Sequence, residues 1–577
     1  MRQWMVAAKK ADFYAIAEKF HVDPVVARII RNREVIGEKN IRIYLGGNLS
    51  DLSDPHQMKD MDRLVEILAQ KIRKQVHIRI IGDYDVDGVT SSHLFLTALR
   101  RVGAKVDVVI PHRIQDGYGL SLHLLQQAKE DGVDTILTCD NGIAAIDEIA
   151  WAKAQKMTVL VTDHHAVPFE EHEGRRTEKK SLADAVVNPH QQDCRYPYKE
   201  LCGAGVAWNV IRVLYENYDM DKREAEDLLD FVAMATVCDV MSLTGENRIL
   251  VKEGLKRIRH TKNIGLQALM QACNVQPENI SAYHFGYVLG PCVNATGRLD
   301  TARHALRLFE TGQETEAEEI ARDLVDLNQE RKELTLQGVE MAKKLCEEGG
   351  YENDPVLVLF LPDVHESIAG LIAGRIREMY NRPVFVLTRG EEGVKGSGRS
   401  TENYSMYENM CGCAELFTKF GGHPMAAGLS LPEENVEKFR RKINENCPLT
   451  VEEVCPDIHI DMAMPVGYAS TELVHQFALL EPFGKDNPSP LFADRNLSIS
   501  RMWVIGKNRN VLRMSVLSEY GQPVPVIFFG DVETLFAYFT EKFGQEEVEN
   551  ALHGRKNRIL FSMVYTCLLY TSPSPRD

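Results

Sequence analysis

The chain has 577 residues, too many for one compact core of ordinary domain size, so we expect three to four domains. Hydrophobic residues make up 44% and charged residues 26% of the chain, proportions that argue against a disordered or fibrous protein. No run approaches the roughly 20 apolar residues of a membrane span, and the charged N-terminus does not resemble a signal peptide, so we expect a cytoplasmic protein.

The net charge is strongly acidic. Lys and Arg total 67 against 83 Asp and Glu, which gives a formal net charge of −16. This balance argues against a non-specific coat on nucleic acid, but it does not fix the local sign at a site, where divalent cations can offset clustered carboxylates. The twelve cysteines are scattered without a CxxC pair, which indicates neither a disulfide framework nor a zinc site.

The first part of the chain predicts a parallel sheet. After an N-terminal helical segment (1–74), short β-branched runs alternate with helical patterns, as in βαβ units, and we assign 75–240 to one α/β domain. Ligands of open α/β sheets bind outside the carboxyl ends of the strands, so a site is expected there. The expected strands are 77–83, 106–113, 134–140, 157–163 and 184–190.

The middle of the chain predicts a helical region followed by a second α/β domain. Residues 241–350 end in a long amphipathic pattern that we interpret as a connecting helix. Its apolar residues at helical spacing are Ile320, Leu324, Leu327 and Leu334. Residues 351–447 return to the α/β pattern, with strands expected at 356–362 and 383–388.

The C-terminal part predicts a small β-domain. Five short β-like runs between 456 and 566 favour a barrel of the OB type, a frequent binder of single strands, although the pattern alone fits any small β-domain. Residues 567–577 do not continue the pattern of β-like runs and polar turns, so we interpret them as an aberrant tail.

The strongest local signal is GDYDVDGVTSS, which places Asp83, Asp85 and Asp87 at a spacing of two. On an extended segment this spacing points three carboxylates to one side, which is costly unless hard cations neutralise them. The alternatives are an Asp-rich turn or an isolated calcium loop. The EF-hand pattern is incomplete, because its twelfth position is Leu94 rather than Glu.

Further acidic and imidazole groups follow other apolar segments. Asp140 closes one expected strand, Asp163-His164-His165 closes the next, and Asp239 follows the run FVAMATVC. Alone, a strand-terminal Asp is usually a helix cap and a single His a satisfied polar residue. Together they form a mixed oxygen and nitrogen ligand set that suits Mn²⁺ or Mg²⁺ better than Zn²⁺. Paired metals of this kind recur in phosphoryl-transfer hydrolysis, so the site reads as a phosphoesterase.

A phosphate-binding element is expected at KGSGRS (395–400). Its glycines would let backbone N–H groups approach an anion, and Ser397 and Arg399 add donors. Between 371 and 400 there are six Lys or Arg residues against three Glu, although a basic surface loop would look the same. No GxxxxGK[ST] sequence occurs, so a nucleoside triphosphatase is not supported.

The ordered motifs resemble a known family. DYDVDG, CDNG, DHH and ATVCD look like the four motifs of the DHH phosphoesterase superfamily, and GSGRS followed by GGHPMAAG (421–428) looks like its DHHA1 domain. GPCVNATGRLD (290–300) and EPFGKDNPSPLF (481–492) are similar to motifs of the RecJ branch, bacterial 5′ to 3′ exonucleases specific for single-stranded DNA. The resemblance covers about 75–566.

The resemblance implies roles for the residues that match the motifs. His165 would contact the scissile phosphate, and Asp163 would orient its neighbours. The implied ligands of two divalent ions, Mn²⁺ or Mg²⁺, are Asp85, Asp87, Asp140, His164 and Asp239, with Asp83 at the edge of the cluster. The implied substrate-binding residues, several of them around a 5′-phosphate pocket, are Arg113, Tyr118, Asn294, Arg298, Ser397, Arg399 and His423.

The sequence departs from the family pattern in four places. Cys292 stands where a basic residue is usual, VHESIAG lacks a glycine after its histidine, and Cys238 lies close to the fourth motif. At the C-terminus, RILFSMVYT continues into CLLYTSPSPRD where a final barrel strand is expected, so an incomplete barrel is predicted.

Three functions compete. The first is a 5′ to 3′ exonuclease that releases mononucleotides from single-stranded DNA in recombination and repair, acting as a monomer alongside a helicase and a single-strand-binding protein. The second is a phosphodiesterase of short oligonucleotides or cyclic dinucleotides, whose relatives end after GGH…AAG and lack the barrel. The third is a non-catalytic binding subunit, which loss of metal ligands would mark, whereas here every ligand is present. We favour the first.

Overall fold

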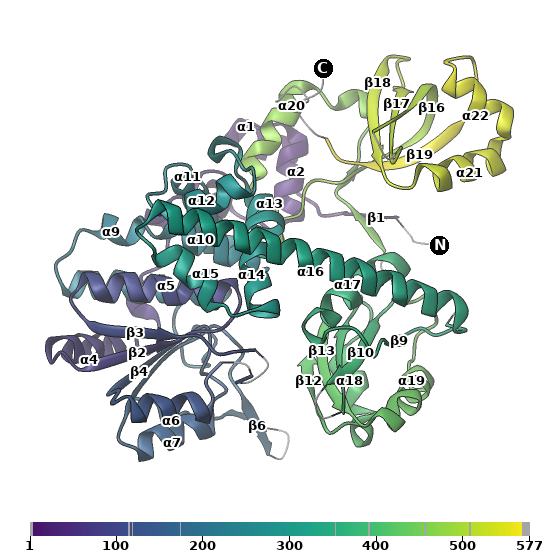
Figure 1. Ribbon diagram of the computed structural model, residues 1–577. Coiled ribbons are helices and arrows are strands. Elements are labelled where there is room, and N and C mark those ends of the chain that lie inside the picture. The colour runs from purple at the N-terminus through teal and green to yellow at the C-terminus, as the bar shows by residue number, and fades with distance from the viewer. Residues whose placement is uncertain are drawn as a thin grey trace. The chain divides into compact units, whose positions relative to one another are not determined.

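The computed structural model describes residues 4–113, 116–117, 119–172, 175–351, 353–390, 393–454, 457–506 and 509–567 (Figure 1). By its internal contacts the chain forms two units. Unit 1 contains residues 47–456 and 482–487, and unit 2 contains 2–46, 457–481 and 488–577.

Unit 1 begins with the expected parallel sheet. Its strand order is β3-β2-β4-β5-β8, and every neighbouring pair is parallel. The strands are β2 (His77–Ile81), β3 (Lys105–Val109), β4 (Thr135–Cys139), β5 (Thr158–Thr162) and β8 (Ala185–Val187).

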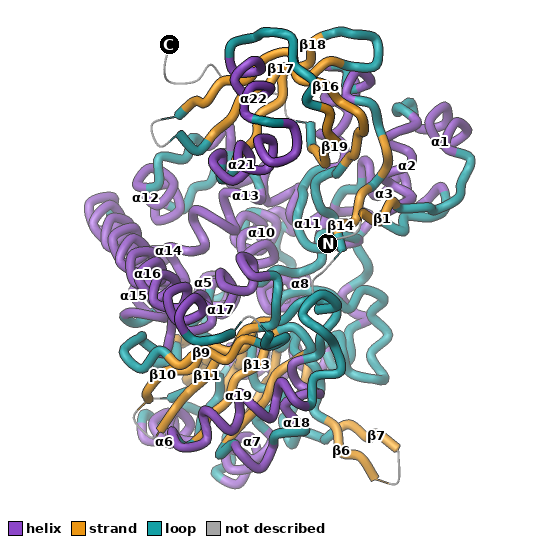
Figure 2. The backbone as a smooth tube through the Cα atoms, turned by 90° about the vertical axis from the view of Figure 1, so that its right-hand side faces the viewer, coloured by secondary structure: helices purple, strands orange, loops and turns teal. Residues whose placement is uncertain are grey.

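Helices cover both faces of this sheet, as a buried parallel sheet requires. Alternate strand residues point to opposite sides, so Ile80 and Ile81 enter two different cores. The helices of the first core are α4 (Met61–Arg73), α5 (Val86–Arg101) and α8 (Gly203–Asn217), and those of the second are α6 (Leu122–Glu130) and α7 (Ile146–Ala154). The hairpin β6 (Phe169–His172) and β7 (Arg175–Glu178) projects from this domain (Figure 2).

A helical region follows the sheet and ends in the expected long connector. It comprises α9 (Lys222–Glu226), α10 (Leu229–Cys238), α11 (Gly245–Ile258), α12 (Ile264–Ala272), α13 (Ala282–His284), the π-helical turn η4 (Phe285–Leu289), α14 (Gly290–Leu299) and α15 (Arg303–Glu310). The connector α16 (Glu314–Glu348) buries Ile320 and Leu324 in the first core and Val339 and Ala342 in the core of the next domain. It therefore connects the first domain of unit 1 to the second (Figure 1).

The second domain of unit 1 is a five-stranded mixed sheet with the order β12-β13-β11-β10-β9. Its strands are β9 (Leu357–Phe360), β10 (Val384–Gly390), β11 (Gly393–Arg399), β12 (Lys419–His423) and β13 (Ala426–Leu431). The helix α17 (Ala369–Tyr380) packs on one face, and α18 (Met406–Cys411) and α19 (Val436–Glu445) pack on the other.

The KGSGRS segment differs from the sequence interpretation. It lies in β11, which pairs with β10 on one side and β13 on the other, and Ser397 is opposite both Val386 and Gly428. Its backbone N–H groups therefore serve the sheet ladder and not an anion. Gly396 and Gly398 instead provide space, because a Cβ on Gly396 would lie 2.4 Å from the Leu387 side chain and one on Gly398 would lie 2.5 Å from Met406.

Unit 2 holds the expected C-terminal β-domain. Its strands are β15 (Met462–Ala463), β16 (Phe492–Ile505), β17 (Val511–Leu517), β18 (Pro523–Phe529) and β19 (Leu560–Tyr565). The sheet order is β15-β16-β17-β18, and β19 pairs with β16. Within the described residues no pairing joins β18 to β15 or β19, so the sheet is curled but open. The helices α20 (Thr471–Gln476), α21 (Val532–Phe543) and α22 (Gln545–Leu552) complete this part.

The N-terminal residues pack with this C-terminal domain, which sequence patterns did not indicate. The helices concerned are α1 (Phe13–Phe20), α2 (Pro24–Asn32) and α3 (Glu38–Gly46), and β1 (Trp4–Val6) pairs in parallel with β14 (Ile458–Ile460). Arg33 donates two hydrogen bonds to Asp461, at 2.7 and 3.0 Å, and both side chains are less than 10% exposed. Asn32 donates to the same carboxylate at 3.2 Å.

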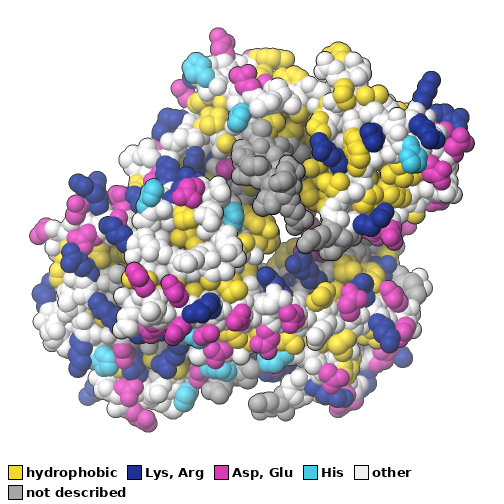
Figure 3. Space-filling view, turned by 45° about the horizontal axis from the view of Figure 1, so that its top comes forward, with side chains coloured by type: hydrophobic (Ala, Val, Ile, Leu, Met, Phe, Trp, Pro, Cys, Tyr) yellow, Lys and Arg dark blue, Asp and Glu magenta, His cyan; other side chains and the backbone are white. Residues whose placement is uncertain are grey.

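The surface mixes charges of both signs. On the face in Figure 3, basic and acidic side chains lie interspersed, so the net negative charge is not gathered in one acidic patch there. No described helix combines the length and the apolar composition that a membrane crossing needs.

Replacing Arg33 with Met will test the Arg33–Asp461 pair. Removing one partner of a buried ion pair leaves the other charge uncompensated, so we expect the free energy of unfolding of unit 2 to fall by about 3 to 5 kcal/mol. The control is Arg31→Met, because Arg31 pairs with the exposed Glu34. Chemical denaturation followed by tryptophan fluorescence measures both. Equal, small changes in the free energy of unfolding of the two variants would show that the Arg33–Asp461 pair does not stabilise unit 2.

Candidate metal centre and substrate cleft

Acidic and imidazole side chains gather at the carboxyl edge of the first sheet. Asp140 directly follows β4, Asp163 directly follows β5, and Asp83 comes two residues after β2. These strands are parallel neighbours, so their carboxyl ends meet at one edge. Asp85 caps the N-terminus of α5, and Asp239 caps the C-terminus of α10. The structure brings these side chains together at one edge of the sheet.

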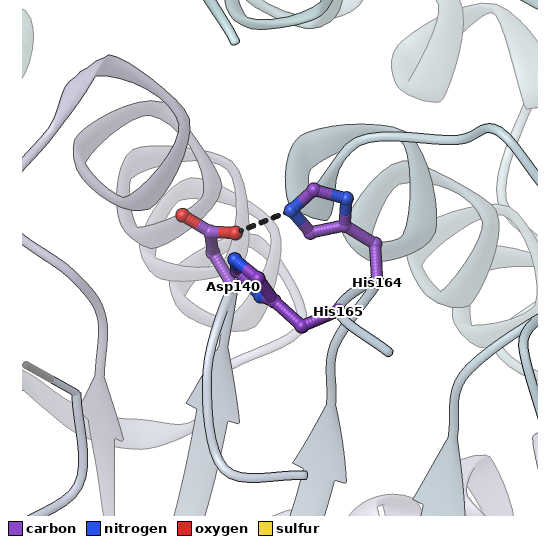
Figure 4. Close-up of side chains that lie close together, drawn as sticks. All are labelled: Asp140, His164 and His165. Carbon is purple, nitrogen blue, oxygen red and sulfur yellow. Dashed lines mark ion pairs between the residues drawn. The ribbon is translucent and has the colours of Figure 1, made fainter. Parts of the chain in front are cut away.

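His164 lies at the centre of the cluster. Figure 4 shows its ring directed at Asp140, with His165 beside it, all three at the ends of neighbouring strands. The Nε2 atom of His164 is within 4 Å of three carboxylates, at 3.0 Å from Asp140, 3.6 Å from Asp239 and 3.7 Å from Asp87. One nitrogen therefore faces oxygens that come from three separate segments.

The ligand atoms suit divalent cations. The side chains form three overlapping groups, and within each group the potential ligand atoms lie within 4.8 Å of one another. The groups are Asp83, Asp85 and Asp140; Asp87, His164 and Asp239; and Asp140, His164 and His165. The carboxylate of Asp83 is fully buried, and burial together with the charge of Asp85 disfavours its ionised form. Buried carboxylates this close together are costly, so this oxygen-rich donor set fits a hard cation such as Mn²⁺ or Mg²⁺.

The cluster is electrostatically unfavourable as it stands. Burial, followed by the charge of Asp87, raises the pKa of Asp140 well above its ordinary value. Burial and Asp85 do the same to the pKa of Asp83. Burial and Asp87 raise the pKa of Asp239, although His165 and Lys485 act in the opposite direction. The protein thus holds carboxylates together against their mutual repulsion.

Asp87 is held by a helix N-terminus. Its two oxygens accept hydrogen bonds from the backbone N–H groups of Gly203, at 2.6 Å, and Ala204, at 2.7 Å, which begin α8. This position stabilises a negative charge. Gly203 also touches Asp140, because a Cβ there would lie 2.6 Å from the Asp140 Cβ. Sequence reasoning missed this support, and its only signal was the glycine pair in LCGAG.

Asp163 positions His165. Its Oδ1 accepts a hydrogen bond from Nδ1 of His165 at 2.8 Å, and its Oδ2 accepts one from the backbone of Ile143 at 2.8 Å. Burial alone would lower the pKa of His165, but Asp163 and the nearby carboxylates raise it to about 9. Burial alone would likewise raise the pKa of Asp163, but the hydrogen bond to His165 lowers it. The pairing with Asp163 therefore favours the protonated form of the His165 ring.

Three arginines predicted to bind substrate form a second group. Burial, followed by the charges of Arg113 and other arginines, lowers the pKa of Arg298 to about 10. The same two causes lower the pKa of Arg399. Arg298 donates to the carbonyl of Ser367 at 2.7 Å, so it bridges the helical region and the second domain of unit 1. Crowded, partly buried guanidinium groups favour an anionic ligand.

A cleft of about 440 Å³ adjoins these arginines. Arg113 lines it and lies over the ring of Tyr84, at 5.0 Å from the ring centroid. Ser397 and Lys395 line it from β11. Tyr84, in the middle of DYDVDG, and Ser367 were not anticipated from the sequence, because their contacts depend on the folded chain.

The other predicted substrate residues have different positions. The Oδ1 of Asn294 accepts a hydrogen bond from the backbone of Val86 at 3.2 Å, so its carbonyl supports the DYDVDG loop. His423 is exposed at the end of β12, and within the described part of the chain we find no hydrogen bond or ion pair from it to the arginines. Tyr118 lies outside the described residues.

Three family profiles match the chain. The DHH family, N-terminal domain, matches residues 77–236, the DHHA1 domain matches 353–447, and the RecJ OB domain matches 460–564. Together they cover both sheets of unit 1 and the β-domain of unit 2.

Curated relatives and a solved structure agree with these profiles. The single-stranded-DNA-specific exonuclease RecJ of Bacillus subtilis (strain 168) is 33% identical over 512 residues, which are 88% of this chain and 63% of that protein. The protein of the same name from Haemophilus influenzae is 34% identical over 518 residues, which are 86% of this chain and 88% of that protein. The structure of RecJ from Thermus thermophilus in complex with Mn²⁺ is 26% identical, with a TM-score of 0.76 over 91% of this chain and 76% of that one.

Replacing Asp140 with Asn will test whether the cluster is built for cations. In EDTA we expect the variant to be more stable than the wild type by about 1 to 3 kcal/mol, because a poorly compensated buried charge is removed. With Mn²⁺ we expect the order to reverse, because the wild type gains binding energy that the variant lacks.

Thermal unfolding in EDTA and in Mn²⁺ measures both effects. The matched control is Asp147→Asn, an exposed carboxylate in the first turn of α7. If the Asp140 variant were destabilised equally in both solutions, the carboxylate would have a structural role and the cation site would be wrong.

Proposed function

Because the chain belongs to the RecJ family of single-stranded-DNA-specific exonucleases, we propose that it hydrolyses single-stranded DNA from the 5′ end and releases mononucleotides. The observation that carries the proposal is the pairing of a buried carboxylate and histidine cluster with a group of partly buried arginines in the same unit. The first suits the cations of phosphoester hydrolysis, and the second suits a terminal phosphate.

Two divalent ions, Mn²⁺ or Mg²⁺, are the proposed cofactors. Their ligands are Asp85, Asp87, Asp140, His164 and Asp239, with Asp83 at the edge of the cluster. When bound, such ions lower the pKa of water and stabilise the leaving oxygen. The donor set supports this, because it supplies acidic oxygens from three segments and places His164 among them.

His165 has a separate role in the proposal. Its cationic ring contacts a non-bridging oxygen of the scissile phosphate and stabilises the charge that develops there. Asp163 fixes the ring through Nδ1, which leaves Nε2 as the donor toward substrate. The carboxylate of Asp163 is held by backbone N–H groups, including that of His164 at 2.7 Å, so the pair is anchored at the end of β5.

The arginine group sets the direction of the reaction. Arg113, Arg298 and Arg399, with Ser397, hold the terminal 5′-phosphate, because crowded guanidinium groups lose their repulsion when a dianion lies between them. A strand anchored by its 5′ end presents its first phosphodiester to the cations. The enzyme therefore cuts one nucleotide from that end.

The β-domain of unit 2 has its own features of a single-strand binder. The guanidinium groups of Arg501 and Arg513 lie 5.0 and 6.0 Å from the ring centroid of Trp503, a mixture of cation and aromatic ring that suits single strands. The match of 460–564 to the RecJ OB domain favours a long strand over a short oligonucleotide. We place the activity in DNA recombination and repair.

Three further features belong to the proposal. A helicase and a single-strand-binding protein work alongside the enzyme, since duplex DNA must first be opened. The chain is proposed to act as a monomer. Its place is the cytoplasm, where the chromosome of a bacterium lies.

A time course with Mn²⁺ on single-stranded DNA labelled at either end tests the proposal. We expect early release of labelled mononucleotide from the 5′ end alone, none from a blunt duplex and none in EDTA. His164→Ala should lower turnover at least about a hundredfold, because it removes a ligand of the proposed cations. The control is His56→Ala, since His56 lies in the 3₁₀ turn Pro55–Gln57 and pairs with Asp62. Near-normal turnover of a folded His164 variant would refute the metal site.

Replacing Arg399 with Gln tests the 5′-phosphate pocket. We expect the ratio of kcat/KM for 5′-phosphorylated over 5′-hydroxyl DNA to fall about tenfold or more, because a charge-assisted contact is lost. Arg389→Gln is the control, since Arg389 is exposed on β10 and pairs with Glu433. Equal losses on both substrates would mean that Arg399 does not contact the terminal phosphate.

A further inference from the structure

Two exposed tyrosines stack on each other in the helical region of unit 1. Tyr283 and Tyr287 are 63% and 70% exposed. Their ring centroids are 5.1 Å apart and their planes differ by 25°. The residues are four apart, so both rings lie on one side of the α13–η4 helix. Such a pair presents two large flat faces to solvent.

The helix that carries the tyrosines packs on the end of α10, next to the proposed metal ligand Asp239. The Sγ atom of Cys238 donates to the carbonyl of Phe285 at 3.3 Å. Gly290 permits this approach, since a Cβ there would lie 2.3 Å from Cys238 Sγ. The turn η4 is π-helical, a rare geometry that is frequent at functional sites.

The turn after Asp239 has two further features of a binding surface. Val240 is 61% exposed and has φ 55°, a strained conformation for a β-branched residue. Leu243 donates its backbone N–H to the carbonyl of Lys485 at 2.9 Å, which brings the exposed Lys485 to this turn. Lys485 belongs to EPFGKDNPSPLF, a motif to which the proposed function gives no role.

An exposed i, i+4 aromatic pair could also serve only to stabilise its own helix. Two observations favour a nucleic-acid strand as the occupant. The pair adjoins the end of α10 that carries Asp239, so it continues the proposed site. The cation Lys485 beside the same turn complements a phosphate backbone. Aromatic faces next to a cation are the combination that single strands use.

We propose that Tyr283 and Tyr287 stack on bases of the single strand that follow the scissile phosphate. This inference rests on the proposed function and adds to it a surface that holds the strand on the 3′ side of the cut. Stacking needs no particular base, so the surface accepts any sequence. Duplex DNA does not fit, because its bases are already stacked on each other.

An abasic scan of the substrate tests the stacking. We would prepare 5′-phosphorylated single strands with one tetrahydrofuran abasic residue at each of the first six positions and a 3′ fluorophore. Anisotropy in EDTA gives the affinity of each strand without hydrolysis. For the wild type we expect about a tenfold loss of affinity at one or two neighbouring positions. For Tyr283→Ala/Tyr287→Ala we expect weak binding of the intact strand and no further loss at those positions.

Two controls separate stacking from other effects. Tyr283→Phe/Tyr287→Phe keeps the rings and should retain the wild-type pattern. Tyr14→Ala, on the exposed helix α1, should also leave the pattern unchanged. If the double alanine variant and the wild type showed the same losses at every abasic position, the tyrosines would not stack on the strand.

The same preparations distinguish this result from failure of the proposed function. If the wild type released no nucleotide with Mn²⁺, the exonuclease assignment would fall. If it released nucleotides from the 5′ end but the abasic pattern did not depend on the tyrosines, only the stacking surface would be wrong.

Discussion

Several carboxylates lie close together in a largely buried space at the edge of the first sheet. Their negative charges repel one another, and the surrounding parts of unit 1 must compensate for this repulsion. Asp83, Asp87 and Asp140 are almost fully buried. Burial and their neighbours raise the pKa values of Asp83 and Asp140 well above the ordinary range. A cluster of this kind is unstable unless positive charge is supplied. Backbone N–H groups of α8 supply part of it, and divalent cations are the natural source of the remainder.

The chain around the carboxylate cluster is held by close packing and by hydrogen bonds from a neighbouring helix. The helix α14 packs closely against the DYDVDG loop. A Cβ on Gly297 of this helix would lie 2.3 Å from the carbonyl oxygen of Tyr84 in the loop. The same helix carries Asn294, which accepts a hydrogen bond from Val86, and Arg298, which reaches Ser367 of the second domain. One helix thus contacts both the DYDVDG loop, which carries proposed metal ligands, and Ser367 of the second domain, through Arg298 of the proposed phosphate pocket. Sites that act on a phosphodiester at a fixed distance from an anchored end need such a frame.

Sequence patterns predicted the parts of the structure that depend on local order. Strand ends could be located from apolar runs, so the convergence of Asp140, His164 and Asp83 followed from the rule for parallel sheets. What could not be predicted depends on long-range packing. The contact of Gly203 with Asp140 and the buried pair of Arg33 with Asp461 join residues that are far apart in the chain. The glycines of KGSGRS are compatible both with an anion-binding loop and with a closely packed strand. The sequence alone does not distinguish the two, whereas the pairing of β11 with β10 and β13 shows a strand.

Anomalous diffraction at the manganese edge, from crystals of the full chain grown with Mn²⁺, tests most directly whether the buried carboxylates bind two divalent cations. We expect two peaks, both within coordination distance of oxygens from Asp85, Asp87, Asp140 and Asp239, and one of them beside Nε2 of His164. Peaks found only at exposed carboxylates, with the buried cluster empty, would contradict this expectation.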